Sequence, residues 1–113
     1  MRDFLFIIRG GQDRYNQNSP EEMQQHMQDW QQWMDTLAQK DMLVGGQPLM
    51  NEAKTLIDGG QKIIDRPLAE GKELIGGYLL IKANSLEHAA EVAKECPSNE
   101  YHCSIEVREI SPM

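Results

Sequence analysis

Two stretches of the sequence, DFLFIIR (3–9) and YLLIKA (78–83), are rich in aromatic and aliphatic residues and are typical of β-strands. Successive side chains of a strand point to opposite faces of a sheet. Along both stretches the apolar residues occupy odd and even positions alike. Both faces of these strands must therefore be covered, which places them in the middle of a sheet with apolar material on each side.

A long helix is predicted over 20–40. Ser19 is the expected N-cap, Pro20 suits the first helical position, and Glu22 completes a capping box. The apolar residues that follow recur at steps of three and four, which predicts a single apolar stripe made of Met23, Met27, Trp30, Met34 and Leu37. This helix can cover one face of the sheet.

A second helix is predicted over 84–96. Ser85 is its expected N-cap, and Pro97 stops it. Its buried side is expected to consist of Leu86, Ala89, Ala90 and Val92 or Ala93. With only two helices in the chain, the other face of the sheet needs a different cover.

The remaining elements are a strand over 42–49, a hairpin over 54–64 that turns at Asp58-Gly59-Gly60, and a strand over 103–110. The order is β-α-β-(hairpin)-β-α-β, an α+β ferredoxin-like arrangement with two helices on one face of the sheet. Residues 1–113 form a single domain, because nothing in the chain has the length or composition of a linker. The uncovered apolar face predicts a homodimer that packs sheet to sheet, as a dimeric α/β barrel.

Charge and cysteine usage exclude several classes of function. The chain has a net charge of −7, and no two Lys or Arg residues are adjacent, so nucleic-acid binding is not expected. The apolar run FLFII is too short for a signal peptide or a membrane span. The two cysteines, Cys96 and Cys103, are predicted to be free thiols in the cytoplasm. The spacing of histidines and acids predicts no metal site and no cofactor.

His26 and Asp65 are the two candidate catalytic residues. His26 lies beside the apolar stripe of the first helix, where Asp29 could hydrogen-bond one ring nitrogen. The alternative is a half-buried histidine without a role. Asp65 ends an apolar strand before a bend that Pro67 constrains, where desolvation could raise its pKa and make it a usable base. The alternative is a carboxylate that caps the turn through its own backbone.

Four further residues are candidates for ligand binding. Trp30, Trp33 and Tyr78 are expected to form walls of a cavity, and Arg9 is expected to hold an anionic ligand. The alternative for Arg9 is an ion pair with an acidic residue at the rim of the dimer. Adjacent residues of a strand face opposite ways, so His102 and Cys103 make a weak catalytic pair.

The chain resembles the YCII-related family, in its DGPF-domain branch. The resemblance runs almost from end to end and rests on SPEEMQQHMQDWQQWM, LVGGQPL, DRPLAEGKELIGGYLLIKANSLEHAAEVAKECP and SIEVREI. Of the tetrapeptide that names the branch, Asp65 and Pro67 are present. Arg66 and Leu68 stand where the family usually has glycine and an aromatic residue, which makes the bend less permissive and reshapes the wall beside it.

The resemblance implies a ferredoxin-like fold assembled as a dimeric α/β barrel, with a helix histidine and a strand-end aspartate as candidate active site. These correspond to His26 and Asp65. Two functions follow as hypotheses. The first is a cofactor-independent enzyme in which the pair exchanges a proton with a small molecule. The second is a non-catalytic dimer that senses a ligand or binds a protein partner, since some members are encoded beside extracytoplasmic-function sigma factors.

Overall fold

The computed structural model describes residues 1–12 and 16–112, so residues 13–15 of the predicted polar loop over 10–18 lie outside the described part. A four-stranded antiparallel sheet has the order β2-β5-β1-β6. Its strands are β1 (Arg2–Arg9), β2 (Leu43–Pro48), β5 (Ile75–Ala83) and β6 (Ser104–Glu109). The two strands that are apolar on both faces, β1 and β5, occupy the centre, as their sequences predict.

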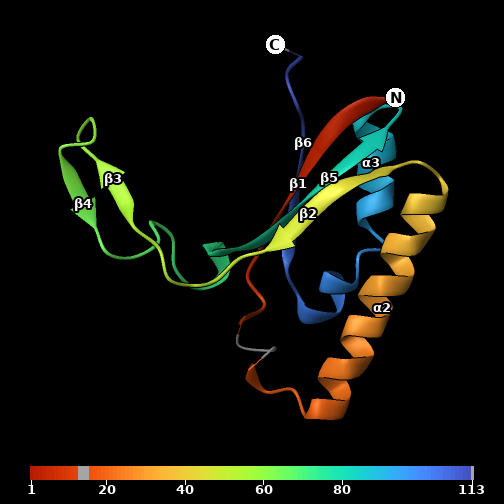
Figure 1. Ribbon diagram of the computed structural model, residues 1–113, viewed down its shortest axis with the longest axis horizontal. Helices are drawn as coiled ribbons and strands as arrows, with labels where there is room; N and C mark the ends of the chain where they lie inside the picture. The colour runs from red at the N-terminus through yellow and green to blue at the C-terminus, as the bar shows by residue number, and fades with distance from the viewer. Residues whose placement is uncertain (13–15, 113) are drawn as a thin grey trace.

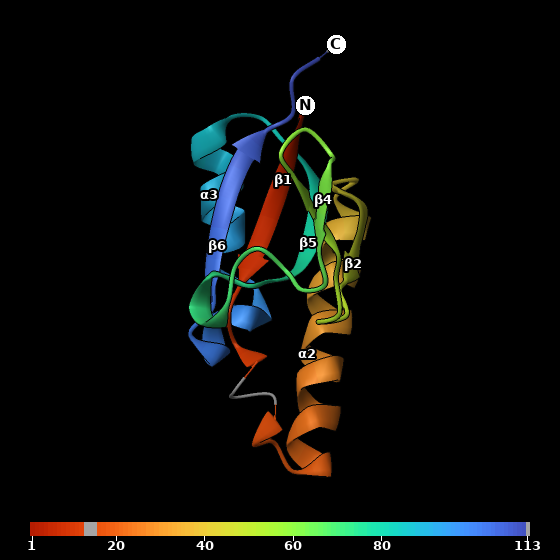
Figure 2. The ribbon, with the colours of Figure 1, turned by 90° about the vertical axis from the view of Figure 1, so that its left-hand side faces the viewer.

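Two helices, α2 (Pro20–Gln39) and α3 (Leu86–Ala93), pack on the same face of this sheet (Figure 2). Short 3-10 helices, η1 (Gly71–Glu73) and η2 (Pro97–Tyr101), connect the strands and helices. The element order and the one-sided helical cover confirm the ferredoxin-like α+β fold. Within one chain the sheet stays open and does not close into a barrel.

The predicted helix caps are present. The hydroxyl of Ser19 accepts a hydrogen bond from the backbone N–H of Glu22 at 3.1 Å, and the Glu22 carboxylate accepts one from the N–H of Ser19. At the start of α3, the hydroxyl of Ser85 accepts a hydrogen bond from the backbone N–H of His88. The predicted stripe of α2 is wrong at Met27, which is 65% exposed. The buried residues of α2 are instead His26, Trp33 and Leu37, and the ring of His26 is covered by Tyr101 of η2.

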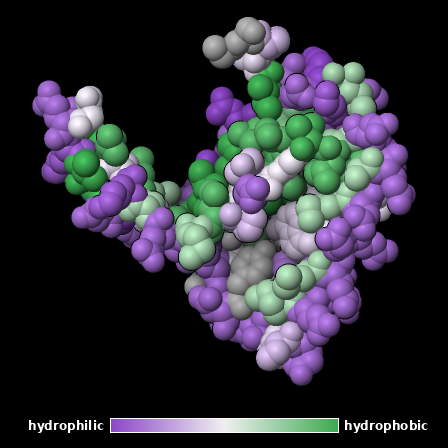
Figure 3. Space-filling view, in the orientation of Figure 1, coloured by the Kyte–Doolittle hydropathy of each residue, from purple (hydrophilic) through white to green (hydrophobic). Residues whose placement is uncertain are grey.

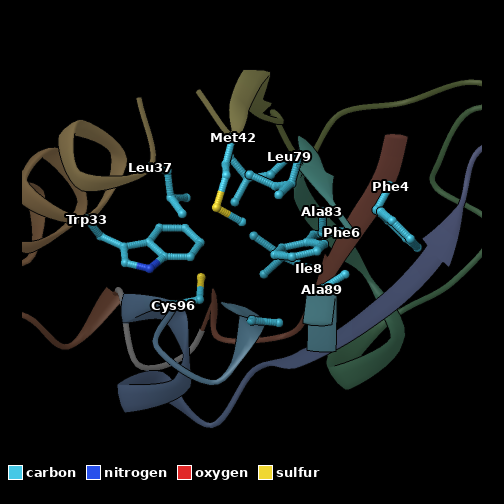
Figure 4. Packing of buried hydrophobic residues seen from close by; sticks show 12 residues of the cluster. Phe4, Phe6, Ile8, Trp33, Leu37, Met42, Leu79, Ala83, Ala89 and Cys96 are labelled. Carbon is cyan, nitrogen blue, oxygen red and sulfur yellow. The ribbon is translucent and has the colours of Figure 1, made fainter. Parts of the chain in front are cut away.

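The core lies between the sheet and the helices (Figure 4). Phe4, Phe6 and Ile81 are completely buried in it. Trp33 of α2 belongs to the same cluster and packs near Leu37 and Cys96. Because these side chains fill the space between the layers, they hold α2 and its histidine in place against the sheet.

Strand β5 starts at Ile75, three residues before the predicted start. The backbone of β2 runs so close that a Cβ at Gly77 would lie 3.1 Å from the carbonyl oxygen of Gln47. On the other strand, a Cβ at Gly46 would lie 2.5 Å from the Leu79 side chain. The glycines therefore permit the two strands to pair, which lengthens β5 toward the bend that precedes it.

The hairpin of β3 (Thr55–Ile57) and β4 (Lys62–Ile64) forms a separate two-stranded sheet that projects from the body (Figure 1). Its turn has positive φ angles at Asp58, Gly59 and Gly60, as expected for a tight hairpin. The Cα radius of gyration is 15.5 Å, against about 13 Å for a compact domain of this length. The hairpin accounts for this excess, and residues 54–65 are called the arm below.

Candidate functional site

His26 is the most deeply buried titratable side chain among the candidates, with 5% of its surface exposed. Its Nε2 atom accepts a hydrogen bond from the indole N–H of Trp30, one turn later on α2, at 2.9 Å. The expected partner, Asp29, instead accepts a hydrogen bond from Gln25. Trp30 therefore fixes the orientation of the imidazole ring.

Burial lowers the pKa of His26 below its ordinary value, because the charged imidazolium is poorly solvated there. The negative charges of Glu100 and Asp29 oppose this effect. The lowered pKa keeps the ring neutral around pH 7, which is the state that can accept a proton.

An aromatic row connects His26 with the surface. Its ring stacks on Tyr101 of η2, with centroids 4.2 Å apart and planes inclined by 16°. On its other side Trp30 meets His26 edge-on and then Trp33, with centroids 5.6 Å apart for the two indoles. The Tyr101 hydroxyl accepts a hydrogen bond from the amide of Asn18. The row runs from the hydrophobic core to the wall of a cavity.

The cavity has a volume of about 630 Å³ and lies between the ends of β1 and η2 and the bend over 65–74. Its lining includes Tyr101 and His102 on one side and the bend on the other. The polar side chains along the bend are Arg66, Glu70 and Lys72. Arg66 and Glu70 form an exposed ion pair of 3.8 Å. The cavity thus combines an aromatic wall with side chains of both charges.

Asp65 lies on the arm, not in this cavity. Its carboxylate accepts a hydrogen bond from the Lys54 ammonium at 2.5 Å, and 78% of its side chain is exposed. This ion pair across the base of the hairpin corresponds to neither interpretation made from the sequence, since water reaches the carboxylate and the partner is a side chain. Such exposed pairs contribute little to stability.

A second cavity, of about 560 Å³, contains Asp65 and Lys54 in its lining. Asn51, Arg66 and Pro67 line both cavities. Asp65 lines the second cavity, whereas His26 lines neither and lies behind Tyr101, which lines the first.

The other predicted ligand-binding residues lie in different places. Trp33 is a core residue, while Trp30 is half-buried in the aromatic row. Tyr78 lies half-buried on the open face of the sheet, opposite Ile7. Arg9 pairs with Glu106 at 3.5 Å and donates a hydrogen bond to the carbonyl of Glu73, both within one chain.

Sequence reasoning missed Tyr101 and His102 as parts of the site. Tyr101 lies in a stretch without periodicity, so no pattern marks it as the residue that covers His26. His102 has one local signal, a neighbouring proline-started turn, but its positive φ of 57° appears only in the structure. Residues other than glycine rarely adopt this backbone conformation, and those that do are found disproportionately near functional sites.

Both cysteines are free thiols, as expected from their spacing. Burial raises the pKa of Cys96 and of Cys103, which keeps them protonated and argues against a catalytic pair of Cys103 with His102. Within residues 1–12 and 16–112, no group of three or more histidine, cysteine or acidic side chains could hold a metal ion. In the same residues, no helix is long and apolar enough to cross a membrane.

Comparison with known proteins places the chain in a family. Its fold is similar to that of 5-chloro-2-hydroxyhydroquinone dehydrochlorinase from Burkholderia phenoliruptrix AC1100, solved in complex with 2,5-dihydroxybenzoquinone. The TM-score is 0.53 and the identity 16%, over 96% of this chain and 93% of the other. No curated protein matches the chain. The model of the YCII-related domain matches residues 4–113, and the chain therefore belongs to the YCII-related family.

Proposed function

We propose that this protein is a small-molecule enzyme that uses neither a metal nor an organic cofactor. The observation that supports this proposal is the cavity of about 630 Å³, one of whose lining residues, Tyr101, stacks on the buried and neutral His26. That volume lies within the range of small-molecule sites. The dehydrochlorinase of similar fold binds a small quinone, which supports a ligand of comparable size here.

The proposed roles follow from the chemistry of each group. Neutral His26 accepts a proton from the ligand after two changes: the Tyr101 ring, which lies between His26 and the cavity, moves aside, and the hydrogen bond from Trp30 is released. Arg66 and Lys72 hold an anionic or strongly polar group of the ligand. Asp65 is the second member of the acid–base pair and acts from the arm side. A proton loss coupled to departure of a leaving group, as in dehydrochlorination, is the reaction class that the related fold supports.

The first test uses 2,5-dihydroxybenzoquinone as a binding probe and a chlorinated hydroxyhydroquinone as a trial substrate. We expect binding of the probe to quench the fluorescence of Trp30 and Trp33, since their row ends at the cavity wall. His26→Gln is expected to reduce turnover by about 10²-fold or more while the variant still binds the probe. His88→Gln, on α3, is the control.

Asp65→Asn is the test of the second catalytic role, with Asp58→Asn in the hairpin turn as its control. We expect the first variant to lose turnover and the second to keep it. Folded His26→Gln and Asp65→Asn variants with full turnover would contradict the acid–base proposal.

One observation favours a second function, a ligand-sensing protein without turnover: Asp65 is exposed and paired with Lys54. Tight binding of the probe without any turnover would support it.

The proposed assembly is a homodimer through the open face of the sheet. Leu5 pairs with Leu80, and Ile7 with Tyr78, across β1 and β5, and all four side chains are only half-buried. A second copy would cover this apolar strip and complete the barrel. Ile7→Lys is expected to give a monomer in sedimentation velocity, because it places a charge in the middle of the strip.

A further inference from the structure

The arm stands opposite the open face of the sheet and leaves a hollow between them. In Figure 1 the arm lies to the left of the sheet and the helices to its right, and in Figure 2 the arm lies in front of the sheet and the helices behind it. The space-filling view shows this hollow between arm and body, with apolar residues along both of its sides (Figure 3). An isolated chain would expose both apolar surfaces to water.

The arm has too few internal contacts to be stable as an isolated hairpin. Each of its strands, Thr55–Ile57 and Lys62–Ile64, has only three residues, and a two-stranded hairpin is at best marginally stable in water. Its central cross-strand pair is Leu56 and Ile63, which are 60% and 58% exposed. An apolar pair at this position requires a covering surface.

The distribution of charge indicates which surface that is. Helix α2 carries four carboxylates and no lysine or arginine, so a basic protein partner would be drawn to the helical side. The arm has two lysines and two aspartates and is neutral. On the open face, the charged residues of β1, β5 and β6 pair with one another, as in Lys82–Asp3 and Arg9–Glu106. Two neutral, apolar surfaces fit a second copy of the chain without repulsion.

We infer that the arm is a clasp: in the dimer, each arm packs its Leu56–Ile63 pair against the partner subunit and holds the partner's sheet in the hollow. The inference rests on the proposed homodimer and adds the arm to its interface. Arg66, next to the base of the arm, lines both cavities, and Asp65 lines the second. The clasp would therefore also position the bend beside the candidate site.

The experiment measures the dimer dissociation constant by sedimentation equilibrium for wild-type protein and two double variants. Leu56→Ser with Ile63→Ser removes the apolar pair of the arm. Met27→Ser with Leu86→Ser removes two exposed apolar residues from the helices, at 65% and 45% exposure, and is the matched control. Each change acts twice in a two-fold dimer, so the arm variant is expected to dissociate at least about 100-fold more readily. The control is expected to match the wild type.

The outcomes separate the clasp from the dimer itself. If the wild-type protein is still a monomer at about 100 µM, both the homodimer and the clasp are overturned, since stable interfaces form well below this concentration. If the wild type is a dimer and the arm variant has the same dissociation constant, the clasp alone is overturned.

Hydrogen exchange on the wild-type protein gives a second measurement, which does not depend on whether a variant folds correctly. On dilution through the dissociation constant, arm amides should exchange faster while those of β1 do not; exchange of the arm independent of concentration would overturn the clasp.

Discussion

The two faces of the sheet are made by the same strands but are covered very differently. On the helical face, Phe4 and Phe6 of β1 are completely buried. Their neighbours Leu5 and Ile7 point to the open face and are only half-buried. The helical face is complete within one chain, whereas the open face and the arm are built from apolar residues that have no cover there. The packed core that stabilises the monomer therefore lies on the helical side, and the proposed dimer contact lies on the other side.

The largest expected effect tests this division directly. Phe6→Ala removes a ring from the fully packed face and should lower the free energy of unfolding by about 3–5 kcal/mol. Leu56→Ala in the arm should change it by no more than about 0.5 kcal/mol at concentrations where the chain is monomeric. Urea unfolding in dilute protein measures both. Equal losses would mean that the arm belongs to the folding core of the monomer.

A smaller effect is expected at the edge strand β2, where the body meets the arm. Gly46→Ala should cost about 1–3 kcal/mol, because its Cβ would lie 2.5 Å from the Leu79 side chain and 2.7 Å from the Tyr78 carbonyl oxygen. Gly45→Ala is the matched control, since nothing lies within 4 Å of a Cβ there. Denaturation midpoints of the two variants distinguish them. Equal midpoints would show that β2 and β5 can move apart enough to accommodate the added methyl group at little cost in stability.

The capping box of α2 gives the third contrast. Ser19→Ala removes the acceptor of the Glu22 N–H and should destabilise the protein by about 1 kcal/mol. Lys54→Met breaks the exposed pair with Asp65 in the arm and should cost less than about 1 kcal/mol. Thermal unfolding followed by circular dichroism measures both changes. A larger loss for Lys54→Met would assign the arm a structural role within one chain.

The smallest expected effect is a change in the pH dependence of stability. Because the pKa of His26 is lowered by folding, the unfolded state binds more protons between that lowered pKa and the ordinary value near 6.5. Stability should therefore rise with pH across this window and fall as pH drops below 6.5. His26→Gln should remove this part of the slope, whereas His88→Gln should keep it. Urea unfolding from pH 5 to 7.5 measures the difference; identical slopes in wild type and His26→Gln would contradict it.

Much of the fold could be predicted because its signals are local. Ser19 and Glu22 form the capping box within one turn, and the positive φ angles of the hairpin turn follow from Asp58-Gly59-Gly60. The start of β5 at Ile75 could not be predicted, since it depends on pairing with β2 through glycines distant in sequence. The exposure of Met27 has the same origin, because contacts with distant parts of the chain, such as Tyr101 of η2 on His26, select which side of the helix is buried.

Residues close together in the sequence were enough to predict the family, the order of strands and helices and the N-caps of both helices, although α3 ends at Ala93 and not at the predicted residue 96. Short-range hydrogen bonds and hydrophobic periods decide these features, and they are written in consecutive residues. Three features could be known only from the fold: Tyr101 stacks on His26, Asp65 lies on an exposed arm paired with Lys54, and the arm faces the open side of the sheet. These contacts join residues far apart in the chain, and packing of the whole core selects them.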